Sequence, residues 1–318
     1  MKAKLAGACV AVWLASPAAM AADFPSHELT LTVNYGAGSN TDVASRILAS
    51  GLEKQLGKSV VVENRGGALG TLAVTWLANQ PADAHRVGVV TYATQAISPH
   101  LMNLSYTMDD FAWVCGFGRY RYGVAVRADS PYKTIDDLVA AAKKTDKPIN
   151  FGGSSTPNVL ALLELGRVSG GKFQEISYKS GAEVSTALLG GHIEAIVQNP
   201  SDILPYVKAG TMRLLASASP MRWPEAPNIP TLKEAGYPVS VDSWLGLAVR
   251  AGANKDDVAK LQSACIAAVN DPDISAKIAG TGVDPSALTG QQYLAALREG
   301  YRTMGEAIKA ANIPRISN

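Results

Sequence analysis

The fold is decided by a strand–turn–helix pattern in the segment Leu29-Thr-Leu-Thr-Val-Asn-Tyr-Gly-Ala-Gly-Ser-Asn-Thr-Asp42. Its first five residues alternate between a branched apolar residue and threonine, which predicts a β-strand with one buried face. The glycines then allow the chain to turn tightly. From Thr41 to about Gly57, apolar residues recur at helical spacing and predict a helix with one packed face; they are Val43, Ile47, Leu48, Leu52 and Leu56.

Strands and helices continue to alternate after this unit. Residues 60–62 and 87–92 are predicted strands, and residues 69–79 are a predicted helix. The resulting βαβαβ order predicts a mostly parallel sheet with helices on both faces. A second series of the same kind runs from about residue 149 to 217. The predicted fold class is therefore α/β, with two such units.

Two domains are expected because a chain of 318 residues is longer than one hydrophobic core usually serves. Lobe one is predicted to be discontinuous, from residues 22–122 and 244–318, and lobe two to span 123–243. Strands near Tyr122 and Trp244 would join the lobes. Ligands of open α/β sheets bind beyond the carboxyl ends of the strands, so the predicted site is the cleft between the lobes.

The N-terminus has the pattern of a cleavable secretory signal, predicted over residues 1–21. Lys2 and Lys4 precede an apolar run, and Ala19-Met-Ala21 has the small-x-small spacing of a cleavage site. A membrane anchor is the alternative, but the apolar run is shorter than the roughly 20 residues of a spanning helix. We therefore expect a periplasmic protein.

Composition argues against a nucleic-acid partner. The chain has 29 Lys+Arg and 27 Asp+Glu, and removing the two signal lysines leaves 29 − 2 = 27 against 27. A formally neutral mature chain without a basic segment does not have the charge of a nucleic-acid-binding protein.

Residues for catalysis or metal binding are scarce. The four histidines stand at positions 27, 85, 100 and 192, and none is paired at metal-ligand spacing. Gly152-Gly-Ser-Ser-Thr156 lacks the last glycine of a nucleophile elbow. We predict no catalytic residue, no metal and no cofactor; a dispersed catalytic set is the alternative.

Two loops have the pattern of anion sites. In the first, Tyr35–Asp42, the backbone N–H groups from Ala37 through Gly38, Ser39 and Asn40 to Thr41 would meet a carboxylate at the start of a helix. Asp42 would repel an anion, so its expected role is to cap the helix or to fix the loop. An ordinary capped turn is the alternative, and this loop alone does not decide between the two.

The second loop, Gly152–Asn158, repeats this design in lobe two. Ser154 and Ser155 offer hydroxyls, and Thr156 is the predicted N-cap before Pro157. Two such loops, one in each lobe, could bind one ligand from both sides. Neither loop contains a basic residue, and the nearby Lys179 is interpreted as a surface charge.

The two cysteines of the mature chain, Cys115 and Cys265, each lie in an apolar stretch. The expected compartment permits a disulfide. Because the sequence does not give their separation in space, both states stay open, and two buried free thiols are the favoured interpretation.

Motifs in a shared order resemble the extracytoplasmic receptors of tripartite tricarboxylate transporters, the Bug family. They are Ala37-Gly-Ser-Asn-Thr-Asp42, Gly57-Lys-Ser-Val-Val-Val-Glu-Asn-Arg65, Tyr178-Lys-Ser-Gly-Ala182, Pro227-Asn-Ile-Pro-Thr-Leu-Lys-Glu-Ala-Gly236 and Ser243-Trp-Leu-Gly246. The resemblance implies a two-lobed Venus flytrap, a bound small carboxylate, a monomer and a two-component membrane transporter as partner. It also implies that Thr91, Tyr92, Thr94 and Asn199 complete the cleft.

The first loop departs from the family pattern Pro-Phe-x-Ala-Gly-Gly-x-Thr-Asp. Asn34 replaces the proline, Tyr35 the aromatic residue and Ser39 the second glycine. The carboxylate therefore stays open between an aliphatic di- or tricarboxylate and an aromatic acid, on which Tyr35 could stack. A neutral or amide ligand, or presentation of the ligand to a signalling protein, are the alternatives.

Overall fold

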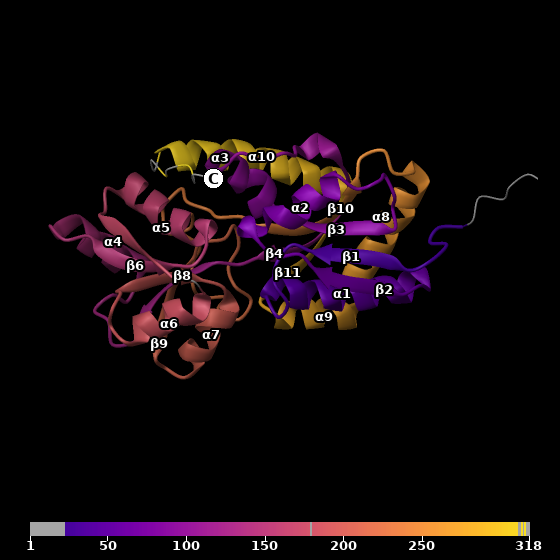
Figure 1. Ribbon diagram of the computed structural model, residues 1–318. Coiled ribbons are helices and arrows are strands. Elements are labelled where there is room, and N and C mark those ends of the chain that lie inside the picture. Colours follow the sequence, from indigo (N-terminus) through magenta and orange to yellow (C-terminus); the bar gives the residue numbers. More distant parts are fainter. Residues whose placement is uncertain (1–22, 179, 311–312, 314, 316–318) are drawn as a thin grey trace, which may run out of the picture.

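The computed structural model describes residues 23–178, 180–310, 313 and 315. The predicted signal segment 1–21 and Lys179 lie outside the described residues. The described chain forms two α/β units, each built on one mixed sheet (Figure 1). We call the unit around the six-stranded sheet lobe one and the unit around the five-stranded sheet lobe two.

Lobe one has the strand order β11-β4-β10-β3-β1-β2. As the first α/β pattern predicts, β1 pairs in parallel with both β2 and β3. The strands of this sheet are β1 Leu29–Val33, β2 Val60–Asn64, β3 Arg86–Thr91, β4 Phe111–Tyr120, β10 Trp244–Arg250 and β11 Val283–Thr289.

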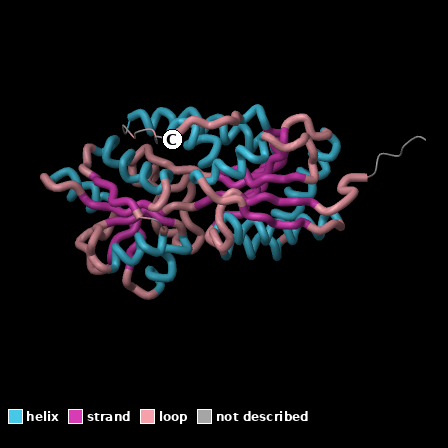
Figure 2. The backbone as a smooth tube through the Cα atoms, in the orientation of Figure 1, coloured by secondary structure: helices cyan, strands magenta, loops and turns pink. Residues whose placement is uncertain are grey.

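Helices cover both faces of this sheet, and α10 extends along one side of the molecule toward lobe two (Figures 1 and 2). The helices are α1 Asn40–Leu56, α2 Thr71–Ala78, α3 Ser98–Leu101, α8 Lys255–Asn270, α9 Pro272–Gly280 and α10 Gly290–Ala310. Three short turns of other helical types are η1 Ala68–Gly70, η2 Ala93–Ile97 and η3 Met108–Asp110.

Lobe two has the strand order β7-β6-β8-β5-β9. Its strands are β5 Gly123–Arg127, β6 Ile149–Gly153, β7 Phe173–Ser177, β8 Ala195–Gln198 and β9 Met212–Ser217. Its helices are α4 Ile135–Lys144, α5 Thr156–Ser169, α6 Gly181–Leu189 and α7 Pro200–Lys208.

The sequence pattern predicts mostly parallel sheets, and this prediction is wrong for both sheets, which are mixed. The connections between the lobes explain the difference. The chain leaves lobe one at the end of β4 and returns at the start of β10, so these strands must run in opposite directions. They pair antiparallel, with Trp244 opposite Arg119. On the far side of the junction, Gly123 of β5 pairs with Ser217 of β9, and this pairing is also antiparallel. The division of the chain at residues 122 and 244 stays a prediction.

Two backbone hydrogen bonds hold the outgoing segment in place, one with the returning segment at Ser243 and one with Ala218, which follows β9 in lobe two. The backbone N–H of Tyr120 donates to the carbonyl of Ser243, and the N–H of Ala218 donates to the carbonyl of Tyr122, both at 2.8 Å. The junction is therefore a narrow pair of adjacent strands, which places the side chains of residues 120, 122 and 243 at the boundary between the lobes.

Local sequence determines where the helices begin. Ser39 caps α1, and its hydroxyl accepts a hydrogen bond from the Asp42 N–H at 3.2 Å. At the start of α5, the predicted N-cap is wrong by one residue: Ser155 has the extended N-cap backbone, and Thr156 is the first helical residue. Pro157 still stands within the first turn, where its missing N–H costs no helical hydrogen bond.

The favoured interpretation of the cysteines is wrong. Cys115 on β4 and Cys265 on α8 are both fully buried and form a disulfide across 150 residues of chain. The helix packs directly on the strand within the core of lobe one, which brings the two thiols together. The disulfide therefore ties the C-terminal helices to the strand that leads into lobe two.

Strand β11 was not predicted from the sequence, because Pro285 interrupts its pattern. The strand lies at the edge of the sheet, and its pairing with β4 shifts register after Pro285. A proline is tolerated there because an edge strand has one side without a partner.

Candidate functional site

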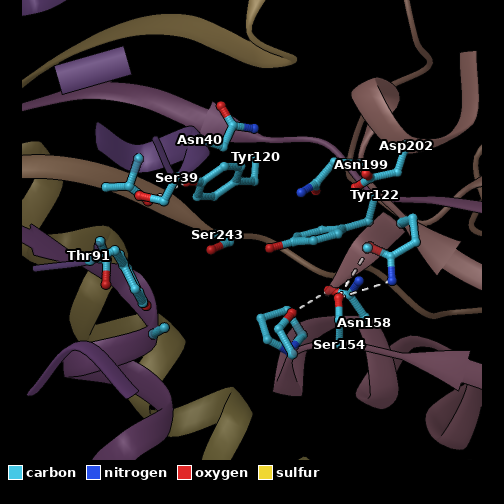
Figure 3. Close-up of a pocket in the computed structure, with 17 residues that line it drawn as sticks. Ser39, Asn40, Thr91, Tyr120, Tyr122, Ser154, Asn158, Asn199, Asp202 and Ser243 are labelled. Carbon is cyan, nitrogen blue, oxygen red and sulfur yellow. Dashed lines mark hydrogen bonds between the residues drawn. The ribbon is translucent and has the colours of Figure 1, made fainter. Parts of the chain in front are cut away.

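The candidate site is a cavity of about 250 Å³ between the lobes, beside the junction strands (Figure 3). Lobe one contributes the first predicted loop and the end of β3, and lobe two contributes the second predicted loop and the starts of α6 and α7. The lining residues are Tyr35, Ser39, Asn40, Thr41, Thr91, Ala93, Tyr120, Tyr122, Ser154, Ser155, Pro157, Asn158, Gly181, Gln198, Asn199, Asp202 and Ser243.

Eight of the fourteen residues predicted from sequence line this cavity. They are Tyr35, Ser39, Asn40, Thr41, Thr91, Ser154, Ser155 and Asn199. The other six lie outside its lining: Ala37, Gly38, Asp42, Tyr92, Thr94 and Thr156. The two predicted loops therefore face one another across a single cavity.

Asp42 fixes the first loop rather than facing the cavity. Its carboxylate accepts hydrogen bonds from the backbone N–H of Gly38 and from Asn64 Nδ2, both at 2.8 Å. Arg46 Nε adds an ion pair at 3.0 Å. Asn64 Nδ2 also reaches the carbonyl of Tyr35 at 3.0 Å. This network confirms the loop-fixing role expected of Asp42.

The hydrogen bonds also decide the charge state of Asp42. Its burial alone would raise the pKa of the carboxyl, but the bonds from Asn64, Gly38 and Arg46 outweigh burial and leave the pKa below the usual value. Asp42 is therefore a stable carboxylate whose oxygens are already occupied by the protein.

Fewer backbone N–H groups of the first loop are free to bind an anion than the sequence predicts. The N–H of Gly38 donates to Asp42, and the N–H of Ser39 donates to the carbonyl of Gly36 at 3.2 Å. Within the described chain, the N–H groups of Asn40 and Thr41 have no partner. They are the first two amides of a 17-residue helix, where unpaired donors and the positive end of the helix dipole favour an anion.

Three helices of lobe two also begin at the cavity. The lining includes Asn158 in the first turn of α5, Gly181 at the start of α6, and Asn199 and Asp202 at the start of α7. The cavity thus lies at the N-terminal ends of four helices, which give it a positive field without a basic side chain.

In the second loop, the polar side chains hold one another in place. Gln198 Nε2 donates to Ser154 Oγ at 3.1 Å, and Asn158 Nδ2 donates to the carbonyl of Val197 at 2.6 Å. Ser155 Oγ donates to Asn158 Oδ1. The side-chain oxygens of Asn40 and Asn199, one in each lobe, are buried without a partner among the described residues. These oxygens are free to accept hydrogen bonds from a ligand.

Tyr92 and Thr94 point away from the cavity. The Tyr92 ring packs against Gly300 of α10, where an added Cβ would approach it to 2.2 Å. Thr94 Oγ1 donates to the carbonyl of Thr91 at 2.8 Å and is fully buried. The neighbouring residues Thr91 and Ala93 line the cavity instead.

The sequence prediction missed the junction residues Tyr120, Tyr122 and Ser243. Tyr120 Oη lies 2.6 Å from Thr41 Oγ1, which links the junction to the first turn of α1. Burial raises the pKa of both tyrosines, so they remain neutral. The available signal was their position: two tyrosines flank the predicted connection between the lobes.

Asp202 was also missed, and it is the only charged residue in the described lining of the cavity. Burial raises the pKa of its carboxyl above the usual value. No group of three histidine, cysteine or acidic residues that could hold a metal occurs in the described ranges.

The sequence model of the tripartite tricarboxylate transporter family receptor matches residues 44–313. The chain belongs to this receptor family. A UPF0065 protein of Cupriavidus necator is 33% identical over 297 residues, which cover 92% of this chain and 90% of the relative. Receptors of the family are periplasmic solute-binding proteins rather than enzymes, and this chain is one of them.

Solved structures agree with the two-lobed receptor fold. The periplasmic binding protein BugD is similar with a TM-score of 0.76 and 25% identity, over 92% of this chain and all (100%) of that one. A protein of R. palustris, solved with adipate, is similar with a TM-score of 0.80 and 25% identity over the same shares of 92% and 100%. The Bug-type resemblance and the flytrap fold predicted from sequence are thereby confirmed.

Proposed function

We propose that this receptor captures a small carboxylate in the cavity between its lobes and delivers it to a two-component membrane transporter. Export of the receptor to the periplasm would use residues 1–21 as a cleaved signal. The observation that carries the proposal is the pair of unpaired N–H groups of Asn40 and Thr41, which stand at the start of α1 beside the cavity.

The chemistry of the first loop favours an anion with two oxygens. Two adjacent amides at a helix N-terminus match the spacing of a carboxylate, and the hydroxyls of Ser39 and Thr41 stand beside them. Asp42 does not oppose this anion, because its carboxylate is engaged by Gly38, Asn64 and Arg46. The R. palustris neighbour solved with adipate supports a carboxylate ligand for this fold.

Binding would also change the balance between open and closed lobes. A ligand that contacts Asn40 in lobe one and Ser154 in lobe two makes both sets of contacts only when the lobes are together. Its higher affinity for the closed form then shifts the population toward that form. A transporter that recognises the closed form would receive loaded receptors in preference to empty ones.

The test is a thermal-shift screen of the chain from residue 22 onward against aliphatic di- and tricarboxylates, aromatic acids and amino acids. Each hit is compared with the matching amide by calorimetry. An acid at about a hundredfold its dissociation constant should add about 2.7 kcal/mol of stability. Loss of binding with the amide is the expected result. Binding of neutral compounds and of no acid would contradict the carboxylate proposal.

A further inference from the structure

The lone carboxylate in the cavity lining, Asp202, has no partner within the described chain. It stands in the first turn of α7, and its side chain lies in lobe two near Asn199 and Tyr122 (Figure 3). No described residue forms an ion pair or a side-chain hydrogen bond with its carboxylate, and burial raises the pKa of the group. A partly buried carboxylate of this kind is stabilised by a cation or by a hydrogen-bond donor.

Asp202 already occupies the position where lobe two would hold an anion. Its carboxylate lies against Gly181, where an added Cβ would stand 2.4 Å from Oδ2. Gly181 is the first residue of α6, and Asp202 lies in the first turn of α7, so the protein supplies its own negative charge to two helix N-termini. A second ligand carboxylate there would meet a like charge, and the described lining has no basic residue to offset it.

The tyrosines of the cavity offer ring surface to a ligand. The hydroxyl group of Tyr120 is already engaged in a hydrogen bond with Thr41 Oγ1 at 2.6 Å. The rings of Tyr120 and Tyr122 lie 6.4 Å apart at 40°. Neutral aromatic rings beside a carboxylate are a favourable environment for a cationic nitrogen.

We propose that the ligand is a zwitterion, with a carboxylate at the start of α1 and an ammonium group between Asp202 and the junction tyrosines. The ammonium would donate to the Asp202 carboxylate and to the unpartnered Oδ1 of Asn199. This inference rests on the proposed function, since it uses the same cavity and the same carboxylate site. It narrows the substrate class from carboxylates to amino acids whose amine lies away from the carboxylate bound at α1.

The test is calorimetry with matched sets of three compounds that differ only at the far end. The amino acids are β-alanine, γ-aminobutyrate and δ-aminovalerate; the monocarboxylates are propionate, butyrate and valerate; the dicarboxylates are succinate, glutarate and adipate. We expect one amino acid to bind at least about tenfold more tightly than both of its matched acids, since hydrogen bonds to charged groups have this magnitude.

The variant Asp202→Asn keeps the size of the side chain and removes its charge. It should weaken binding of that amino acid by roughly 10- to 100-fold. It should not weaken binding of the matched monocarboxylate, because removal of a negative charge near the site favours an anion. Tyr122→Leu should also weaken the amino acid, whereas Tyr122→Phe retains the ring and most of the affinity. This second pair keeps the test valid if Asp202→Asn does not fold.

Three results would overturn the inference. If a dicarboxylate binds the unaltered receptor most tightly, or if Asp202→Asn leaves the affinity for the amino acid unchanged, the zwitterion is wrong while the carboxylate function stands. If no compound in the panel binds, the zwitterion is wrong, and the screen of tricarboxylates and aromatic acids described above decides whether the carboxylate function stands.

Discussion

Removing the Asp42 carboxylate should loosen the first loop and reduce ligand binding. Asp42→Ala deletes the acceptor for Gly38 N–H and Asn64 Nδ2 and the ion pair with Arg46. Hydrogen bonds to a charged group contribute about 1.5 kcal/mol or more each, and the Arg46 side chain is 47% exposed, so its share is small. We expect a loss of about 2–4 kcal/mol in the free energy of unfolding.

The sign of the binding effect makes this prediction specific. Removing a negative charge near the site would, by charge alone, strengthen the binding of an anion. The loop, however, would no longer hold the Asn40 and Thr41 amides in place, so we expect affinity for the acid found in the screen to fall by about tenfold or more. Urea unfolding and calorimetry measure the two effects.

The matched control is Arg46→Ala, which removes the ion pair and the bond from Arg46 Nη2 to Asn64 Oδ1 but keeps the two hydrogen bonds that Asp42 accepts from Gly38 N–H and Asn64 Nδ2. It should lower stability by less than about 1 kcal/mol and leave affinity unchanged. If Asp42→Ala retained both the stability and the affinity of the unaltered receptor, the loop would not depend on this carboxylate and the reasoning would be refuted.

Three further predictions concern the disulfide, acid stability and a buried glycine. Replacing Cys115 and Cys265 together by alanine should lower the free energy of unfolding by about 5 kcal/mol, because the disulfide closes a loop of 150 residues. The ligand affinity of the folded protein should be unchanged. Equal urea midpoints for this variant and the unaltered receptor would contradict the prediction. The pKa of Asp42 is lowered in the folded state, so the stabilising effect of its carboxylate is present at neutral pH and is lost as pH falls below about 4. Asp42→Asn should therefore lose less stability on acidification than the unaltered receptor. Parallel curves of unfolding free energy against pH for the two proteins would argue against this. Gly246→Ala would place a Cβ 2.1 Å from the Tyr293 ring and should cost about 1–3 kcal/mol, whereas Gly280→Ala, in open space within α9, should be neutral or stabilising by up to about 1 kcal/mol; similar melting temperatures for the two variants would refute the packing argument.

Local sequence patterns were sufficient to predict the first loop and its helix. The alternation in β1 and the helical spacing in α1 are short-range signals, and Ser39 and Asp42 are three residues apart, so their mutual contact depends on local geometry alone. The order of family motifs then supplied the two-lobed arrangement, which no local pattern contains.

Side-chain direction was harder to predict than loop position. Thr91 and Ala93 face the cavity, while Tyr92 between them packs on α10. The backbone changes from strand to helix here, since β3 ends at Thr91 and η2 begins at Ala93, and no simple periodicity gives the side-chain directions. The sequence prediction places the segment from Thr91 to Thr94 at the cleft, but it does not determine which side chains of this segment face the cavity.

Contacts across the lobes were the least predictable. The side chains of Tyr120 and Ser243 meet at the cavity because β4 and β10 pair at the junction, and these residues lie more than a hundred positions apart in sequence. The disulfide was ambiguous for the same reason, since only packing of α8 on β4 brings its cysteines together.

The most direct test of the central claim compares ligand affinity after one obstruction in each lobe. Asn40→Leu narrows the cavity from lobe one, Ser154→Leu narrows it from lobe two, and Val43→Leu, on an exposed face of α1, is the control. Calorimetry with the best acid should show at least about tenfold weaker binding for each of the first two variants and unchanged binding for the third. If either cavity variant kept full affinity while folded, the ligand would not be held between the lobes at this site.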